Sequence, residues 1–377
     1  MKTVYIIGAG FLTLAAARAE DTGDPFVGVA PAPQRSANAE PPEWGDNWLF
    51  RREAMAVTAV RAEAPIGGDV FTRLSAGFEI QKRFATATRT VATANYQGRA
   101  VWRGNSGAAA FDSMAMDAAE RVWETHNAYV DIVGVYGAPG VFNLRVGRFY
   151  IPFGLNIATD THGTLLQLSN DRVFGTDRDG QLLAFGSVGA LDYWAGYLFG
   201  AGPDLTLDGQ SGLAAARIGL GSGFLYEHGL EGGLSAAWGE RLDPHHPPHG
   251  PIRTWRAGAD ARQRWDSAAG PATIAVEAAI GADEGASLRS GLIQAEWRSP
   301  SRRWGVAAQY AYLTRDTVRE GRASVLERSA GMVFSRYFRN DPGNAHLHWL
   351  AVGVERPVGV PEDASGTRVA LQYYRYW

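Results

Sequence analysis

Short stretches of alternating apolar and polar residues make up most of the chain from residue 49 onward. In the clearest of them, 271–281, Ile274 and Ile280 share one face while Glu277 lies on the other. Alternation with a period of two over about ten residues predicts a β-strand that spans a membrane, because a helix would repeat about every 3.6 residues. Runs of the same kind occur at 69–81, 254–265 and 303–315.

Weaker stretches bring the expected number of strands to about sixteen. The expected ranges are 49–64, 67–81, 89–103, 121–137, 140–149, 181–187, 190–200, 212–219, 229–239, 252–265, 270–281, 287–298, 302–315, 325–339, 345–357 and 367–377. An even number is expected when both ends of the strand array lie on the same side of the membrane. The pattern therefore predicts an all-β fold, a transmembrane antiparallel up-and-down β-barrel of about 16 strands.

Connection lengths support this topology. The connections after even-numbered strands are mostly short, as at 138–139, 188–189 and 299–301. Several after odd-numbered strands are long: 104–120, 150–180, 201–211 and 240–251. Short periplasmic turns that alternate with longer external loops are typical of barrels in the outer membrane of Gram-negative bacteria.

The first residues have the three parts of a secretory signal. Lys2 gives a positive start, residues 4–16 are almost wholly apolar, and Ala17 and Ala19 are small residues at the positions that a signal peptidase reads. We therefore expect a signal peptide over 1–19. For the Pro-rich segment 20–48, two interpretations stay open: a flexible periplasmic lead-in, or a plug that enters the barrel. The barrel would then occupy 49–377.

Composition narrows the classes of function. The chain has no cysteine, which excludes disulfides and thiolate metal sites, and we expect neither a cofactor nor a metal. The formal net charge of −3 provides no basic footprint, so nucleic acid is not an expected partner. Forty-six glycines and twelve tryptophans suit a barrel with tight turns and aromatic girdles.

One segment resembles a known family. Asn127-Ala128-Tyr129-Val130-Asp131, followed by Phe142-Asn143-Leu144-Arg145-Val146-Gly147-Arg148-Phe149-Tyr150-Ile151-Pro152-Phe153-Gly154-Leu155, is similar to a motif of the phosphate-selective porins. The similarity covers mainly residues 121–156. It implies a porin-like outer-membrane barrel. In sixteen-stranded general porins the loop after the fifth strand folds into the lumen, and a loop as long as 150–180 is either functional or disordered. We therefore expect 150–180 to form a constriction loop inside the lumen.

Charged residues on the lumen faces of the regular strands are the candidate pore lining. These residues are Arg73, Arg99, Arg145, Arg256, Asp260, Arg262, Arg264, Glu277, Arg303 and Arg315, and the same count includes Glu79 and Arg368. The charged residues of the expected constriction loop are Asp160, His162, Asp171, Arg172, Asp177, Arg178 and Asp179. Arginines outnumber acids among the lining residues, which favours anions, with Arg256, Arg262 and Arg145 as the main contributors.

These patterns predict a porin-like channel for passive diffusion of small hydrophilic solutes, with a mild preference for anions. Expected partners are outer-membrane lipid, the barrel-assembly machinery that reads a terminal strand ending at Trp377, and two further copies in a homotrimer. Two alternatives remain: a barrel conduit that sheathes a partner protein, and a barrel enzyme. Because no nucleophile motif is present, we expect no enzyme. His245, His246 and His249 alternate with prolines and fit a solvated loop better than a metal site.

The signal peptide generates the first prediction. Protein isolated from outer membranes should begin at Glu20, because a signal peptidase cleaves after the small residue Ala19. N-terminal sequencing and intact mass will check this. An N-terminus at Met1 in the membrane-embedded protein would contradict it.

Overall fold

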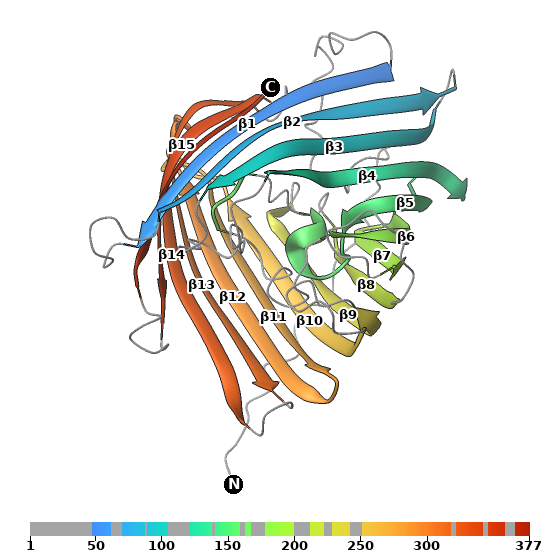
Figure 1. The fold of residues 1–377 in the computed structure, drawn as a ribbon. Coiled ribbons are helices and arrows are strands. Elements are labelled where there is room, and N and C mark those ends of the chain that lie inside the picture. Colours follow the sequence, from blue (N-terminus) through green and yellow to red (C-terminus); the bar gives the residue numbers. More distant parts are fainter. Residues whose placement is uncertain are drawn as a thin grey trace.

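The computed structural model describes residues 47–61, 70–86, 89–104, 121–137, 140–158, 163–166, 178–199, 212–221, 228–241, 251–317, 322–341, 346–358 and 366–377. In these residues, sixteen antiparallel strands form one closed barrel, in which each strand pairs with its sequence neighbours and β1 pairs with β16 (Figure 1). The predicted barrel and its strand number are confirmed. The predicted signal peptide and nearly all of the Pro-rich segment lie outside the described residues.

The strands follow the alternating stretches closely. Their bounds are β1 Trp48–Arg61, β2 Val70–Ala85, β3 Thr90–Gly104, β4 Arg121–Tyr136, β5 Phe142–Tyr150, β6 Arg178–Val188, β7 Leu191–Leu198, β8 Leu213–Leu220, β9 Leu230–Arg241, β10 Ile252–Trp265, β11 Ala272–Asp283, β12 Ala286–Arg298, β13 Trp304–Thr317, β14 Arg322–Asp341, β15 His346–Pro357 and β16 Arg368–Tyr376. A short 3-10 helix, η3, covers Gly154–Ala158. Within the described residues, no helix has the length and the apolar sequence needed to cross a membrane.

The two faces of the wall differ as the alternation predicts. On β11, Ile280 is 55% exposed on the outer face, whereas its neighbour Ala279 is 5% exposed on the inner face. The outer face is rich in exposed large apolar side chains, and the inner face holds buried arginines and carboxylates. An apolar exterior around a polar interior is the arrangement of a barrel whose solvent outside is lipid.

Exposed tryptophans gather at the two ends of the barrel. We call the end where β1 begins and β16 ends the turn end, and the opposite end the loop end. Near the turn end lie Trp48, Trp265, Trp297 and Trp304, and near the loop end lie Trp102, Trp123, Trp238 and Trp255. Two aromatic girdles that flank an apolar band mark the two membrane–water interfaces.

The barrel closes at a seam between the first and last strands. The register runs from Glu53 opposite Tyr376 to Arg61 opposite Arg368. Beyond it, the backbone N–H of Trp377 donates to the Arg52 carbonyl over 3.0 Å. Closure leaves no strand of this sheet with an unpaired edge, which a strand in lipid requires because no water is there to satisfy the backbone.

Gly147, in the segment that resembles the phosphate-selective porins, allows β5 to approach β4 closely. Its φ is +127°, and a Cβ at this position would lie 2.1 Å from the Ala128 carbonyl oxygen and 2.7 Å from the Tyr129 Cα. Both are backbone atoms, so neither can move aside as a flexible side chain could. Only glycine fits here.

Gly147→Ala should therefore destabilise the barrel. The positive φ and the backbone clash together should lower the free energy of unfolding by about 2 to 5 kcal/mol. Gly189→Ala is the matched control: its φ is +61°, but open space surrounds its Cβ position, so a loss of only about 1 kcal/mol is expected. Urea unfolding in lipid vesicles, followed by tryptophan fluorescence, measures both. Equal losses would show that the close approach is unimportant.

Candidate functional site

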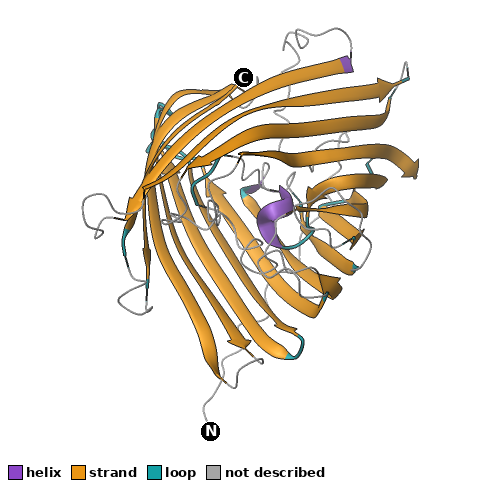
Figure 2. Ribbon diagram, in the orientation of Figure 1, coloured by secondary structure: helices purple, strands orange, loops and turns teal. Residues whose placement is uncertain are grey.

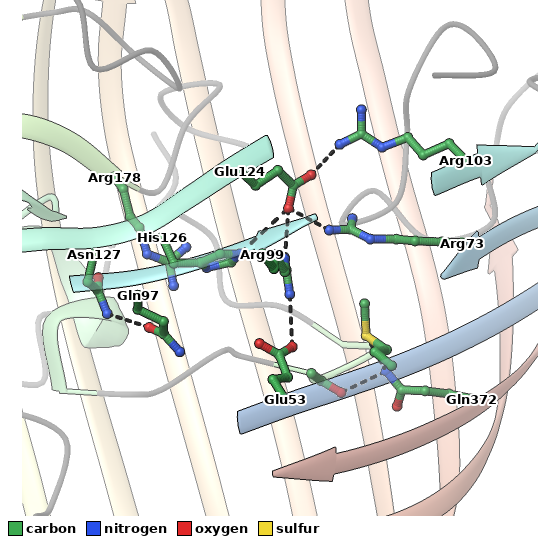
Figure 3. Close-up of polar contacts among 12 residues, drawn as sticks. Glu53, Arg73, Gln97, Arg99, Arg103, Glu124, His126, Asn127, Arg178 and Gln372 are labelled. Carbon is green, nitrogen blue, oxygen red and sulfur yellow. Dashed lines mark hydrogen bonds and ion pairs between the residues drawn. The ribbon is translucent and has the colours of Figure 1, made fainter. Parts of the chain in front are cut away.

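Three arginines converge on one carboxylate near the loop end of β2, β3 and β4 (Figure 3). Arg73 Nη2 and Arg99 Nε lie 2.7 and 2.8 Å from Glu124 Oε2, and Arg103 Nη2 donates to Glu124 Oε1. Arg99 also reaches Glu53 on β1, with Nη1 3.2 Å from Oε1. We call these five residues the Glu124 cluster. It holds three guanidinium charges against two carboxylates.

The sequence did not identify Glu124, and the reason is a β-bulge. Gln97 pairs with Asn127 but Gly98 pairs with Thr125, so His126 is an extra residue in β4. An extra residue reverses the alternation beyond it. Glu124 therefore lies on the lumen face, although simple alternation from Asp131 would place it toward lipid.

Arg145 lies on the inner face, as expected, but it is shielded from the lumen. Its Nε and Nη2 donate to the two carboxylate oxygens of Asp131 over 2.6 and 2.8 Å, and its side chain has 0% exposure. The rings of Tyr129 and Phe149 lie 4.0 and 3.8 Å from its guanidinium carbon. A buried pair with balanced charge contributes little field to a pore, so the expected role of Arg145 as a main contributor is wrong.

Several other predicted lining arginines pair with acids that the sequence count omitted. Arg256 Nη2 lies 2.7 Å from Asp283 Oδ1, and Arg262 Nη2 lies 2.5 Å from Glu231 Oε2. The predicted Asp260 accepts two bonds from Arg217, an arginine that the count also omitted. The further contacts are Arg51–Glu79, Arg264–Asp266, Arg315–Asp283 and Arg368–Glu355.

Arg303 does not line the wall. It lies exposed in the turn between β12 and β13, because β13 begins at Trp304 and not at 302. The alternating pattern continues into the turn, so the predicted strand began two residues too early. Strand ends are the least reliable part of a prediction from sequence.

The chain between β5 and β6 enters the lumen, where η3 lies inside the ring of strands (Figure 2). The backbone N–H of Gly154 donates to Ser235 Oγ over 3.0 Å, and that of Leu155 donates to Glu277 Oε1 over 2.5 Å. The Phe153 ring lies against Gly258, where a Cβ would be 2.6 Å from it. This first part of the loop is therefore fixed to the wall formed by β9, β10 and β11.

A second part of the same loop contacts another side of the wall. The Gly163 carbonyl accepts a bond of 2.8 Å from Gln372 Nε2 on β16. Leu165 and Leu166 are buried in an apolar cluster with residues of β1, β2 and β14–β16, among them Phe71 and Val333. Two described parts of the loop thus occupy the lumen and contact different sections of the barrel.

The structure describes two of the charged residues that were expected in the constriction loop. Arg178 and Asp179 belong to the start of β6 and are buried. The Arg178 guanidinium carbon lies 4.0 Å from the centre of the Tyr150 ring. The predicted residues Asp160, His162, Asp171, Arg172 and Asp177 lie outside the described residues, as do His245, His246 and His249. Within the described residues, no group of three or more His, Asp or Glu side chains could hold a metal ion.

Comparisons with known proteins identify the fold. No family model matches the chain, and no match was found among curated proteins. Solved structures do match: OmpF of Salmonella typhi has a TM-score of 0.56 at 11% identity, covering 88% of this chain and 98% of that one. OprB of Pseudomonas putida gives 0.55 at 10%, covering 88% and 94%. An anion-selective porin of Comamonas acidovorans gives 0.50 at 9%, covering 87% and 98%.

The fold is therefore that of outer-membrane porins. With the apolar exterior and the two tryptophan girdles, it indicates a protein of the Gram-negative outer membrane.

The expectation that the chain is no enzyme requires correction. The similar structures also include OmpT, an outer membrane protein of Vibrio cholerae, at 8–10% identity. A shared barrel does not decide whether a protein catalyses a reaction, so the missing nucleophile motif cannot exclude an enzyme.

The position of the loop generates a prediction. Deleting residues 159–176 should raise single-channel conductance, because part of the cross-section that the loop occupies becomes available to ions. A deletion of 204–209, between β7 and β8, is the control for shortening a loop at the same end. Retained heat-modifiable migration in gels will show that both barrels still fold. Unchanged conductance in a folded 159–176 deletion would contradict the role of the loop as a constriction.

Proposed function

We propose that this protein is an outer-membrane channel for passive diffusion of small hydrophilic solutes, with a mild preference for anions. The porin fold, the polar interior and the loop inside the lumen support a channel. One of the similar structures is described as an anion-selective porin, which is a property of that protein and agrees with the preference proposed here.

The Glu124 cluster is the observation that carries the anion preference. Its three arginines stay protonated at any physiological pH and outnumber the two carboxylates of the cluster, which supports a preference for anions. Arg145, Arg217 and Arg262 pair with acids of neighbouring strands and contribute little net charge. A surplus charge on a narrow wall of low dielectric constant attracts anions and repels cations.

The resemblance to the phosphate-selective porins stays a prediction. Beyond residue 19, Lys82 is the only lysine, and its ammonium lies 4.5 Å from the centre of the Trp48 ring at the turn end. Selectivity would therefore depend on arginine. We propose a preference for small anions in general.

The alternative of a conduit for a partner protein has less support. A conduit needs a lumen wide enough to sheath another chain, but η3 and residues 163–166 already lie inside this barrel.

A homotrimer agrees with the similar OmpT structure described as a trimer form. Delivery by a signal peptide and assembly through the terminal strand that ends at Trp377 complete the proposal.

The reversal potential in a KCl gradient tests the anion preference. Wild-type protein should give an anion-selective sign. Arg73→Gln with Arg103→Gln should shift the potential toward cations, because it removes two charges beside Glu124 while glutamine keeps a hydrogen-bond donor. Arg253→Gln is the control, since Arg253 is exposed on the outer face of β10. A cation-selective wild type, or equal shifts in the control and the double variant, would refute the preference.

A further inference from the structure

Three arginines lie on the outer face of the barrel near its loop end, within the four strands β12–β15 that lie side by side (Figure 1). Arg289 of β12, Arg328 of β14 and Arg356 of β15 are exposed, and each is next to a buried residue of the lumen face. From their position we propose a binding site for a lipid of the external leaflet whose headgroup carries two phosphates. The site is separate from solute passage and does not depend on which ions the channel prefers.

The side chains of these arginines have no partner within the described part of the chain. No hydrogen bond, ion pair or ring contact joins any of the three to another described side chain. Asp316 of β13 lies nearer the loop end, and its carboxylate accepts a hydrogen bond from the Ser287 hydroxyl. A guanidinium keeps its charge at any physiological pH and carries five N–H donors, so each arginine offers its donors to a ligand outside the wall.

The tilt of the strands can be read from the register. Trp297 lies one residue before the turn end of β12, and its register row reaches Phe334 of β14 by way of β13. β14 nevertheless continues to Asp341 at the turn end. A line of constant height in the membrane therefore descends toward the turn end along the rows from β12 to β15, as expected for the tilted strands of a barrel.

The three arginines follow this descent. The row of Arg289 reaches Leu326 on β14, and Arg328 lies two residues nearer the turn end. The row of Arg328 reaches Val358 on β15, whose backbone N–H donates to the Arg328 carbonyl, and Arg356 again lies two residues nearer the turn end. The three side chains thus project at about the same height in the membrane.

This height is that of the loop-end tryptophans. The row of Trp255 on β10 reaches Ser287 on β12, and Arg289 lies two residues nearer the turn end, which is the same descent over two strands. Exposed apolar side chains such as Ile293 and Val354 lie farther toward the turn end. The arginines therefore lie where the apolar band ends, at the membrane–water interface of the external leaflet, where an exposed arginine is tolerated.

Tyr312 of β13 adds a hydroxyl between the arginines. It pairs with Arg328 in the register, is 37% exposed, and its ring lies against Gly291 of β12, where a Cβ would clash with it. Arg328 and Arg356, with Cα atoms about 8 Å apart on neighbouring strands, suit one phosphate. Arg289 and the Tyr312 hydroxyl suit a second phosphate.

The chemistry of the three arginines favours phosphate over other groups in a membrane. A guanidinium binds phosphate through two parallel hydrogen bonds, and basic side chains at a membrane surface attract anionic lipid. The exposed loop-end tryptophans belong to β3, β4, β9 and β10, so on β12–β15 charged donors occupy the height that aromatic rings occupy elsewhere. A headgroup with two phosphates therefore matches both the charge and the spacing of this face.

Native mass spectrometry of the detergent-purified protein tests the site. The protein is titrated with lipid A, a glycolipid with two phosphates, and in parallel with phosphatidylcholine, whose headgroup has no net charge. Wild-type protein should bind lipid A at a much lower concentration. Arg328→Gln should raise the half-saturating concentration of lipid A about tenfold, as expected for the loss of one charge-assisted contact. Arg52→Gln is the matched control and should change nothing, since Arg52 is exposed on the outer face of β1 at the turn end.

The triple variant Arg289→Gln, Arg328→Gln, Arg356→Gln should bind both lipids alike, while heat-modifiable migration shows that it still folds. Unchanged binding in this variant, or an equal effect of Arg52→Gln, overturns the site. Equal binding of lipid A that has lost one phosphate overturns the requirement for two. Displacement of lipid A by an equal concentration of inorganic pyrophosphate would assign the arginines to a soluble anion instead.

A second copy of the chain is the remaining occupant to test. If the triple variant changes from trimer to monomer in gels but keeps its lipid binding, a neighbouring copy covers the arginines and the lipid site is overturned. A cation-selective wild type would defeat the proposed function and leave this site unaffected, so the two failures are distinguishable.

Discussion

The hydrogen bonding of the backbone within lipid is the constraint on which the rest of this structure depends. A strand in hydrocarbon must pair on both edges, so the sheet has to close, and here β1 pairs with β16 over nine residue pairs. Closure fixes which face of every strand meets lipid. The buried arginines and carboxylates of the strands lie on the lumen face, whereas outer-face arginines such as Arg253 and Arg375 lie close to the strand ends. The lumen then has to balance many arginines with acids from neighbouring strands.

How that balance is reached decides what the channel can do. Arg145 with Asp131, and Arg217 with Asp260, form paired bonds that neutralise both charges within the wall. Such pairs shape the interior but add little net field. Net field arises where arginines outnumber carboxylates among the residues that meet, as among the five residues of the Glu124 cluster. The proposed selectivity therefore depends on a local imbalance and not on the overall arginine count.

Sequence alone predicted the sixteen strands because lipid outside and polar groups inside impose a period of two on each of them. It failed where information from other strands is needed. A bulge at His126 hid Glu124, and the partners of Arg256 and Arg262 became evident only once the register had placed Asp283 and Glu231 beside them. Arg303 was placed wrongly because alternation continues into the turn. The alternation within a strand shows which of its side chains face the lumen. Which charged side chains meet depends on the register between neighbouring strands.

The inward loop shows how the same constraint positions the pore. Ser235 and Glu277 sit on lumen faces, and each accepts a backbone N–H of the first part of the loop. Glu277 thus positions the loop through one of its carboxylate oxygens, and Ser235 does so through its hydroxyl oxygen. Arg73 of the Glu124 cluster lies two residues from Phe71, which belongs to the same apolar cluster as Leu165 and Leu166. The charged residues and the loop therefore lie at overlapping depths in the barrel, so selection by charge and selection by size would act on an entering solute together.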